Sequence, residues 1–201
     1  MKLIYTIGHS SHDNIYFLGL LRKYNINCIV DIRSVPFSKY VPHFNKNVIK
    51  KFLNSNNINY VYMADEFGAI REDKNLFNQK GYLDFEIIKH TKSFKDGIVR
   101  LNTGIDKQFV ICLMCTEKDP LDCHRSIMIA PELVKNEFMV NHILLDGSIE
   151  TQQELEKRLL QLYFPTHIQQ DLFSTIEKNI EKDLLEKAYR LRNSDIGHRS
   201  K

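Results

Sequence analysis

The chain has only four cysteines in 201 residues, and it lacks the features that mark several common protein classes. Four cysteines are too few for a disulfide scaffold of this length, so we expect free, metal-bound or reactive thiols. No apolar run approaches the roughly 20 residues that cross a bilayer. The opening stretch MKLIYTIGHS also lacks the basic start, long apolar middle and cleavage site of a secretory signal. These absences predict a cytoplasmic protein with no membrane contact.

Phosphate-binding motifs and a strong charge excess are missing as well. The sequence contains neither a Walker-type phosphate loop nor a G-x-G-x-x-G stretch, which argues against a standard nucleotide triphosphatase or an NAD-linked enzyme. No cofactor is therefore expected. The net charge of +3 neither demands nor excludes a nucleic-acid partner, so any basic surface must be local.

Apolar runs alternate with helical patterns along most of the chain. Strands that are apolar on both faces and alternate with helices indicate a parallel sheet covered on both sides. We therefore predict an α/β fold, with a Rossmann-like parallel sheet of about five strands flanked by helices. The apolar runs that predict the strands are 2–8, 27–32, 58–64, 108–114 and 138–145. Among the predicted helices, one runs from about Phe85 to a stop at Gly104, and another covers 125–136.

The composition changes near Ile149 and becomes rich in Leu, Glu, Lys and Gln. We predict a Rossmann-like domain at 1–148 and a C-terminal helical extension at 149–201. Two helices are expected there, divided near Pro165, and the tail from Asn193 is expected to fray. Two stretches match the spacing of a capping box, Thr151 to Glu154 and Thr166 to Gln169.

The second helix of this extension carries an apolar stripe with four-residue spacing. Such a stripe must cover either the sheet domain or a second subunit, which would form a homodimer through the C-terminal helices. The stripe consists of Ile168, Leu172, Ile176, Ile180 and Leu184.

Polar residues that follow the predicted strands carry the functional signal. In open parallel sheets the functional crevice lies beyond the carboxyl ends of the strands. The opposite strand ends carry mainly Asn, Lys and Gln, which are typical of solvated turns. The sequence therefore predicts a site along one edge of the sheet. The chemically capable groups at that edge are Gly8, His9, Ser10, Asp31, Arg33, Ser34, Asp65, Glu66, Gly68, Cys115, Thr116 and Glu117.

Four sequence blocks, in order, resemble a single family. They are TIGHS, VDIRSVPFS, the FG pair at 67–68 and LMCTEKDPLDCHR. Over about residues 3–146 the chain is similar to the domain-of-unknown-function family 488 (DUF488). The resemblance implies a compact Rossmann-like α/β fold in a bacterial or archaeal intracellular protein, and some relatives are suspected of nucleic-acid processing. The chain departs from the family at Phe67-Gly68-Ala69, where two glycines are usual, which weakens the case for a close backbone approach to a ligand there.

Cys115 is the first candidate for chemistry. It lies where a strand ends and the chain turns toward a helix that begins near Arg125, and helix N–H groups and cations there would lower a thiol pKa. His124 or His9 could act as a base, with Glu117 as an orienting group. The alternative is a small buried thiol, because cysteine is among the most buried residue types. The spacing from Cys115 to Arg125 is too long for the phosphate loop of a cysteine phosphatase.

Metal binding is the second candidate. Cys112 and Cys115 are three residues apart on a strand, so they should point to opposite faces, and we assign Cys112 to the core. A three-ligand site from Cys115, Cys123 and His124 remains open, because these ligand types suit zinc. Adjacent residues rarely point together, however, so no metal is assigned.

Anion capture is the third candidate. His124 and Arg125 fall in the first turn of a predicted helix, where the macrodipole favours anions over positive side chains. A bound phosphate or carboxylate would explain this placement, with Arg33 on the same rim. Two structural alternatives remain: a helix cap by Asp122 that also pairs with Arg125, and an ion pair of Asp31 with Arg33.

These candidates combine into one hypothesis, an enzyme of the hydrolase or transferase type that acts on a phosphate-bearing substrate such as a nucleotide or nucleic acid. The flanking loops mix aromatic residues with Lys and Arg, which suits base stacking. The alternative is a non-catalytic module that binds nucleic acid or protein. The candidate catalytic residues are Cys115, Glu117, His9 and Asp31, and the candidate substrate-binding residues are Ser10, Arg33, Cys123, His124 and Arg125.

Overall fold

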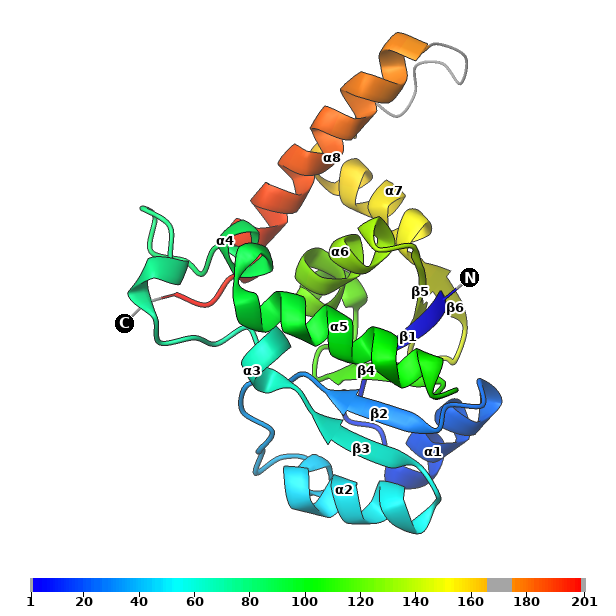
Figure 1. Ribbon diagram of the computed structural model, residues 1–201. Helices are drawn as coiled ribbons and strands as arrows, with labels where there is room; N and C mark the ends of the chain where they lie inside the picture. Colours follow the sequence, from blue (N-terminus) through cyan, green and yellow to red (C-terminus); the bar gives the residue numbers. More distant parts are fainter. Residues whose placement is uncertain (1, 166–174, 200–201) are drawn as a thin grey trace.

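A computed structural model of the chain describes residues 2–165 and 175–199 and contains a six-stranded sheet between two helical layers (Figure 1). The strand order is β3-β2-β4-β1-β5-β6. The first five strands are parallel, as predicted, and β6, which was not predicted, pairs antiparallel with β5. The strands are β1 (Lys2–Gly8), β2 (Cys28–Asp31), β3 (Asn59–Tyr62), β4 (Ile111–Cys115), β5 (Phe138–Ile143) and β6 (Ile149–Thr151).

Burial follows the position of each strand in the sheet. Every residue of β2 and β4 is buried, as expected for inner strands that are covered on both faces. The edge strand β3 exposes Asn59 and half-buries its other residues. Alternation along β4 sends Cys112 and Cys115 into hydrophobic clusters on opposite faces of the sheet, which confirms the assignment of Cys112 to the core.

Helices cover both faces of the sheet. One face is packed by α1 (Asn14–Lys23) and α2 (Lys46–Ser55), which Figure 1 shows below the sheet. The other face is packed mainly by α4, α5 and α6. The remaining elements up to β5 are α3 (Ala64–Phe67), α4 (Phe85–His90), α5 (Lys92–Asp106), α6 (Ala130–Lys135), three 3-10 turns (η1, Pro42–Phe44; η2, Lys74–Leu76; η3, Pro120–Asp122) and a π-helical turn (η4, Arg125–Ile129).

Two helices differ from the sequence-based prediction. The helix expected to end at Gly104 is broken at Thr91, whose hydroxyl donates to the Ile88 carbonyl and accepts from the Phe94 amide as the cap of α5. The helix expected over 125–136 begins as the π-helical turn and becomes α-helical only at Ala130. Pro131 has no N–H to donate back into the preceding turn, which accounts for the irregular start.

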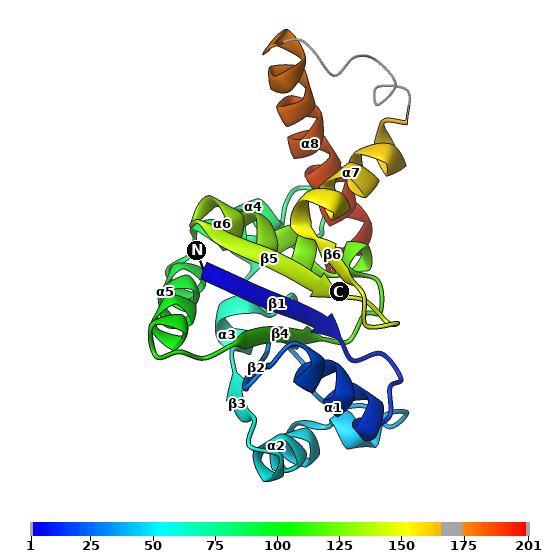
Figure 2. The ribbon, with the colours of Figure 1, turned by 90° about the vertical axis from the view of Figure 1, so that its right-hand side faces the viewer.

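The C-terminal extension contributes β6 to the sheet and two helices, α7 (Gln152–Tyr163) and α8 (Thr175–Ile196). The capping box of Thr151 and Glu154 is present, as predicted. Side chains of both helices, among them Leu155, Leu159 and Ala188, join the core on the α4 and α6 side. In Figure 2 the two helices lie at one end of the molecule, and the amino-terminal part of α8 projects away from the sheet.

The apolar stripe predicted on the second helix is only partly described. Ile180 is half exposed, and Leu184 packs against the core. The side chains of Ile168, Leu172 and Ile176, like the second capping box at Thr166 to Gln169, lie outside the described residues. None of the helices in the described ranges is both long enough and apolar enough to cross a bilayer.

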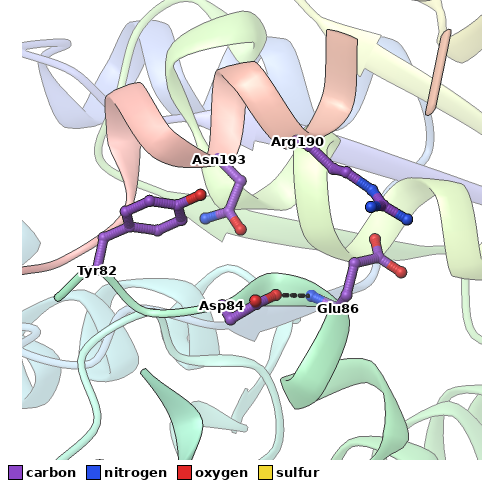
Figure 3. Close-up of a pocket in the computed structure, with 5 residues that line it drawn as sticks. All are labelled: Tyr82, Asp84, Glu86, Arg190 and Asn193. Atoms are coloured by element: carbon purple, nitrogen blue, oxygen red, sulfur yellow. Dashed lines mark hydrogen bonds between the residues drawn. The ribbon is translucent and has the colours of Figure 1, made fainter. Parts of the chain in front are cut away.

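The expectation of a frayed tail is wrong for the residues that can be described. Asn193 is buried, accepts a hydrogen bond from the Phe85 amide and donates one to the Leu83 carbonyl. The Leu83 amide in turn donates to the His198 carbonyl at 2.8 Å. Figure 3 shows Asn193 in a surface pocket of about 280 Å³, whose other lining residues are Tyr82, Asp84, Glu86 and Arg190. Because Asp84 and Asn193 both bond the amides that begin α4, this pocket is a helix-capping junction.

Candidate functional site

The candidate site lies at the topological switch point of the sheet, beyond the carboxyl ends of β1 and β4. β1 and β4 are neighbours, yet the chain leaves β1 toward α1 on one face and leaves β4 toward α6 on the other. In α/β folds such a switch point is the usual place for a ligand. The pairing of the two strands continues past their ends, because the His9 amide donates to the Cys115 carbonyl at 2.9 Å and the Ser10 amide donates to the Thr116 carbonyl at 3.0 Å.

Four reactive side chains come together just beyond β4. One potential ligand atom from each of Cys115, Glu117, Cys123 and His124 lies within 4.8 Å of the others. The Cys115 thiol donates to the Glu117 carboxylate at 2.9 Å. His124 Nδ1 lies 3.9 Å from the Cys115 sulfur and 3.8 Å from the Cys123 sulfur. Cys115, Cys123 and His124 are buried, and Glu117 is half-buried, so the carboxylate forms the side of the cluster nearest to solvent.

The two thiols of this cluster are not equivalent. Burial raises the pKa of Cys115 well above its ordinary value, and the neighbouring Cys123 and Glu117 raise it further. Burial also opposes ionisation of Cys123, but the neighbouring Cys115 thiol and the positive charges of Arg125 and His124 outweigh it, so this pKa is well below its ordinary value. The Arg125 amide donates to the Cys123 sulfur at 3.5 Å, in keeping with a thiolate there.

The Arg125 side chain is completely buried and faces the backbone of the same loop. Its guanidinium donates to the Glu117 carbonyl at 2.8 Å and to the Lys118 carbonyl at 3.4 Å. Within the described part of the chain, its Nε has no hydrogen-bond partner, and neither has Nε2 of His124. In this arrangement Arg125 holds the loop that carries Glu117, and its complete burial keeps the guanidinium away from solvent.

A second group of polar residues lies beyond β2. The Arg33 side chain is 6% exposed and Asp31 is fully buried, and they form the ion pair that was one of the predicted alternatives, with Nε to Oδ1 at 2.8 Å and Nη2 to Oδ2 at 2.6 Å. Arg33 also donates to the Phe44 carbonyl at 2.9 Å. Tyr60 completes the group by donating to Asp31 at 2.6 Å. These bonds satisfy a buried charge pair that would otherwise be costly.

His9 joins the second group to the first. Because Arg33 can only donate, His9 Nε2 accepts from its Nη1 at 3.0 Å, and His9 Nδ1 donates to the Ser10 carbonyl at 2.9 Å. The ring stacks on Phe44 with centroids 4.2 Å apart. Burial and the positive charge of Arg33 lower the pKa of His9 to about 4, so the ring is neutral near pH 7. Both nitrogens are therefore engaged in holding Arg33 and the end of β1.

Other candidates occupy different places. Asp122 does not pair with Arg125 as one alternative proposed; it bonds Arg192 of α8, and Asp119 caps the η3 turn that contains Asp122. This pairing follows from the η3 turn, which leaves Asp122 exposed. Ser10 is half-buried and does not cap α1, because Asp13 does so with two bonds of 2.8 Å. Ser10 adopts a left-handed φ of 45°, a conformation that costs most non-glycine residues about 1–3 kcal/mol.

Sequence reasoning missed Tyr60 and Phe44. Tyr60 lies two residues before Tyr62, which is directly paired with Asp31 across β2 and β3, so the diagonal neighbours share a face. A tyrosine within the third predicted strand was the sequence signal that could have indicated a partner for Asp31. Phe44 contributes a carbonyl from a 3-10 turn, for which the sequence carried no signal.

A comparison with known protein families gives one match. The model of the family described as Domain of unknown function DUF488 matches residues 13–130, more than half of the chain. The chain belongs to this family. The matched range contains Asp31, Arg33 and the cluster beyond β4, whereas His9, Ser10, β5 and the C-terminal helices lie outside it. No curated protein matches the chain. No solved structure matches it either.

The cluster of this DUF488 chain suits two kinds of chemistry. A buried thiolate flanked by an imidazole and a carboxylate can act as a nucleophile with its helpers. Two sulfurs, an imidazole nitrogen and a carboxylate oxygen within 4.8 Å of one another can also hold a transition-metal ion. The adjacent residues Cys123 and His124 point toward the same place, which sequence reasoning had judged rare.

Proposed function

We propose that the chain is an enzyme of the hydrolase or transferase type, with its reacting centre at Cys115, Glu117, Cys123 and His124. The observation that carries this proposal is the convergence of those four side chains at the switch point between β1 and β4. Strongly perturbed titratable groups that lie together are characteristic of functional sites. We assign positioning roles to His9, Arg33 and Asp31. His9 bonds the Ser10 carbonyl, and it is held by Arg33, which pairs with Asp31. The Ser10 amide in turn donates to the Thr116 carbonyl beside Cys115.

We further propose that the substrate carries a phosphate group, as a nucleotide or nucleic acid does. Lys118 is exposed directly beside Glu117, on the side of the cluster nearest to solvent. Phe37 and Tyr40 lie in the loop after β2 and are 71% and 83% exposed. Lys39 Nζ lies 5.1 Å from the Tyr40 ring centre. Exposed aromatic rings beside lysines suit the stacking of bases and the binding of their phosphates.

Turnover of model substrates tests the enzyme proposal. Purified protein would be incubated with p-nitrophenyl phosphate, bis(p-nitrophenyl) phosphate, mononucleotides and short oligonucleotides, with and without added Zn²⁺. We expect turnover by the unaltered chain and a loss of about 100-fold or more in Cys123→Ser and Glu117→Gln. Cys28→Ala is the matched control, because burial raises the pKa of Cys28 to about 11 and its side chain lies in the core. No turnover of any substrate, or equal rates in Cys123→Ser, would overturn the proposal.

The exposed aromatic loop also favours a second candidate, a module that binds single-stranded nucleic acid without catalysis. In that case Phe37→Ser and Tyr40→Ser should each weaken oligonucleotide binding by about 1–3 kcal/mol, without loss of stability. Leu162→Ser is the control, because Leu162 is another exposed apolar side chain, at 52%, but lies on α7. Salt-dependent binding without turnover would favour this module over the enzyme. A homodimer through α8 and a cytoplasmic location remain predictions.

A further inference from the structure

We propose that Cys115, Glu117, Cys123 and His124 bind one transition-metal ion, and that the ion is zinc. Their potential ligand atoms, two sulfurs, one imidazole nitrogen and one carboxylate oxygen, all lie within 4.8 Å of one another. All four come from a single ten-residue segment that begins at the end of β4. The catalytic role of the ion rests on the function proposed above, whereas its binding does not.

The distances fit coordination better than hydrogen bonding. His124 Nδ1 lies 3.9 and 3.8 Å from the sulfurs of Cys115 and Cys123, near the outer limit for any hydrogen bond to sulfur. Around a tetrahedral zinc ion, a sulfur at about 2.3 Å and an imidazole nitrogen at about 2.0–2.1 Å lie about 3.6 Å apart. The imidazole nitrogen therefore already lies close to the ligand-to-ligand distance from each sulfur.

Glu117 is the ligand that must move. Its carboxylate lies 2.9 Å from the Cys115 sulfur, whereas a sulfur and an oxygen on one tetrahedral zinc lie about 3.6 Å apart. Glu117 is the least buried member of the set, so its side chain has room to move outward by the difference. A carboxylate on the solvent side is also the ligand that water or a substrate oxygen can most easily replace, as a catalytic site requires.

The buried donors of the cluster suit a cation. Two thiols and a carboxyl group meet in a place where Cys115 is 3% exposed and Cys123 1% exposed. The guanidinium of Arg125 donates to carbonyls of the loop, so it does not bond these three side chains. Buried groups that can carry charge are usually paired or bound to a metal, and an ion at the centre of the cluster would bond all four side chains.

The loop that carries the ligands is held in place by bonds outside the cluster. Arg125 links to the carbonyls of Glu117 and Lys118, and the Ser126 hydroxyl bonds the Pro120 carbonyl. Asp119 caps the η3 turn and pairs with Arg158 of α7 at 2.6 Å. Such external support positions ligands before the ion arrives and is typical of metal centres. Thiolate and imidazole donors favour zinc over magnesium or calcium, which prefer all-oxygen sites.

Cobalt substitution tests the inference independently of any activity. The full chain would be stripped of metal with a chelator, kept reduced under anaerobic conditions and titrated with Co²⁺. We expect one ion per chain, with the sulfur-to-cobalt charge-transfer band in the near ultraviolet and the strong visible bands of tetrahedral Co²⁺. Added Zn²⁺ should displace the cobalt and abolish these bands.

Four variants identify the ligands. Cys115→Ser and Cys123→Ser should each weaken binding by about 100-fold or more and reduce the charge-transfer band, because each removes a sulfur. Glu117→Gln should keep that band and weaken binding by about 10-fold or more. Cys28→Ala, which removes a buried thiol outside the cluster, should bind like the unaltered chain.

The outcomes separate this inference from the enzyme proposal. Absence of the cobalt bands in the reduced chain, or equal binding by Cys115→Ser, Cys123→Ser and Cys28→Ala, would overturn the metal site. Turnover that persists in the stripped protein would overturn the catalytic role of the ion but would leave the enzyme proposal standing. Stoichiometric binding through both cysteines supports the metal site whether or not any substrate is turned over.

Discussion

Gly8 and Glu117 are so close that a Cβ added to Gly8 would lie 1.8 Å from the Glu117 carbonyl oxygen. The obstructing atom belongs to the backbone, so no side chain can rotate away. We therefore expect Gly8→Ala to push the Glu117 segment away from β1 and to lower the free energy of unfolding by about 1–3 kcal/mol. Urea unfolding followed by circular dichroism measures the change.

Gly19 provides the matched control for this prediction. It is exposed on α1, and an added Cβ would meet no atom within 4 Å. Gly19→Ala should therefore raise the free energy of unfolding by about 0.4–1 kcal/mol, because alanine restricts the unfolded chain. Equal effects of the two substitutions would show that the close approach of Gly8 to Glu117 is not a constraint.

The ion pair of Asp31 and Arg33 makes a second prediction. Asp31→Leu leaves the Arg33 guanidinium buried without its counter-charge, which should cost about 3–5 kcal/mol of unfolding free energy. Tyr60→Phe removes a single bond to the carboxylate and should cost about 1.5–3 kcal/mol. Both can be read from urea midpoints at constant pH.

A double variant separates loss of the pair from loss of packing. Asp31→Leu combined with Arg33→Met removes both charges, and replacing a buried pair by apolar residues is often neutral. The double variant should therefore be more stable than Asp31→Leu alone. If it is less stable, Arg33 contributes through its bonds to His9 and Phe44 more than through its charge.

The parallel core of the fold could be predicted because its signal is local. β2 and β4 are continuous apolar runs, and such runs between helical patterns indicate buried parallel strands. β6 could not be predicted in this way, because it has only three residues, Ile149–Thr151, and two of them are polar. Its strand conformation comes from pairing with β5 across the turn at Gly147, which is a tertiary effect.

The location of the site could also be predicted, but its internal contacts could not. Parallel strands end at a common edge, so His9, Asp31 and Cys115 had to approach one another there. Which partner each side chain meets depends on loop conformation. The η3 turn sends Asp122 to Arg192, and the backbone that enters the π-helical turn places His124 Nδ1 near the sulfurs of both Cys115 and Cys123. Neither irregular turn has a repeating pattern that the sequence could reveal.

Asn193 makes a third prediction, about the attachment of α8. Its amide group bonds the Phe85 amide at 3.0 Å and the Leu83 carbonyl at 2.9 Å, and the side chain is buried. Asn193→Ala should cost about 1–3 kcal/mol, because two buried backbone groups lose their partner. Asn54→Ala, on the exposed side of α2, should change stability by less than about 0.5 kcal/mol. If α8 is cleaved faster by protease in Asn193→Ala but not in Asn54→Ala, the loss of stability lies in the attachment of α8. Equal cleavage of the two variants would contradict the prediction.

His142 makes the last prediction, a loss of stability in mild acid. The ring is fully buried between Thr6 and Gln152, with both bonds at 2.7 Å. Burial and the charge of Arg125 lower its pKa to about 3, although the bond to Gln152 and the charges of Cys123 and Asp119 act in the opposite direction. The unfolded chain gains the proton near pH 6.5 and the folded chain does not. The free energy of unfolding therefore falls as the solution is acidified below that pH, by up to about 1.4 kcal/mol per pH unit.

His142→Gln should remove this pH-dependent loss of stability between about pH 6 and 4.5, whereas His90→Gln, at an exposed position, should not. Urea midpoints measured across that range give both slopes, and identical slopes for the two variants would mean that His142 does not titrate differently on folding.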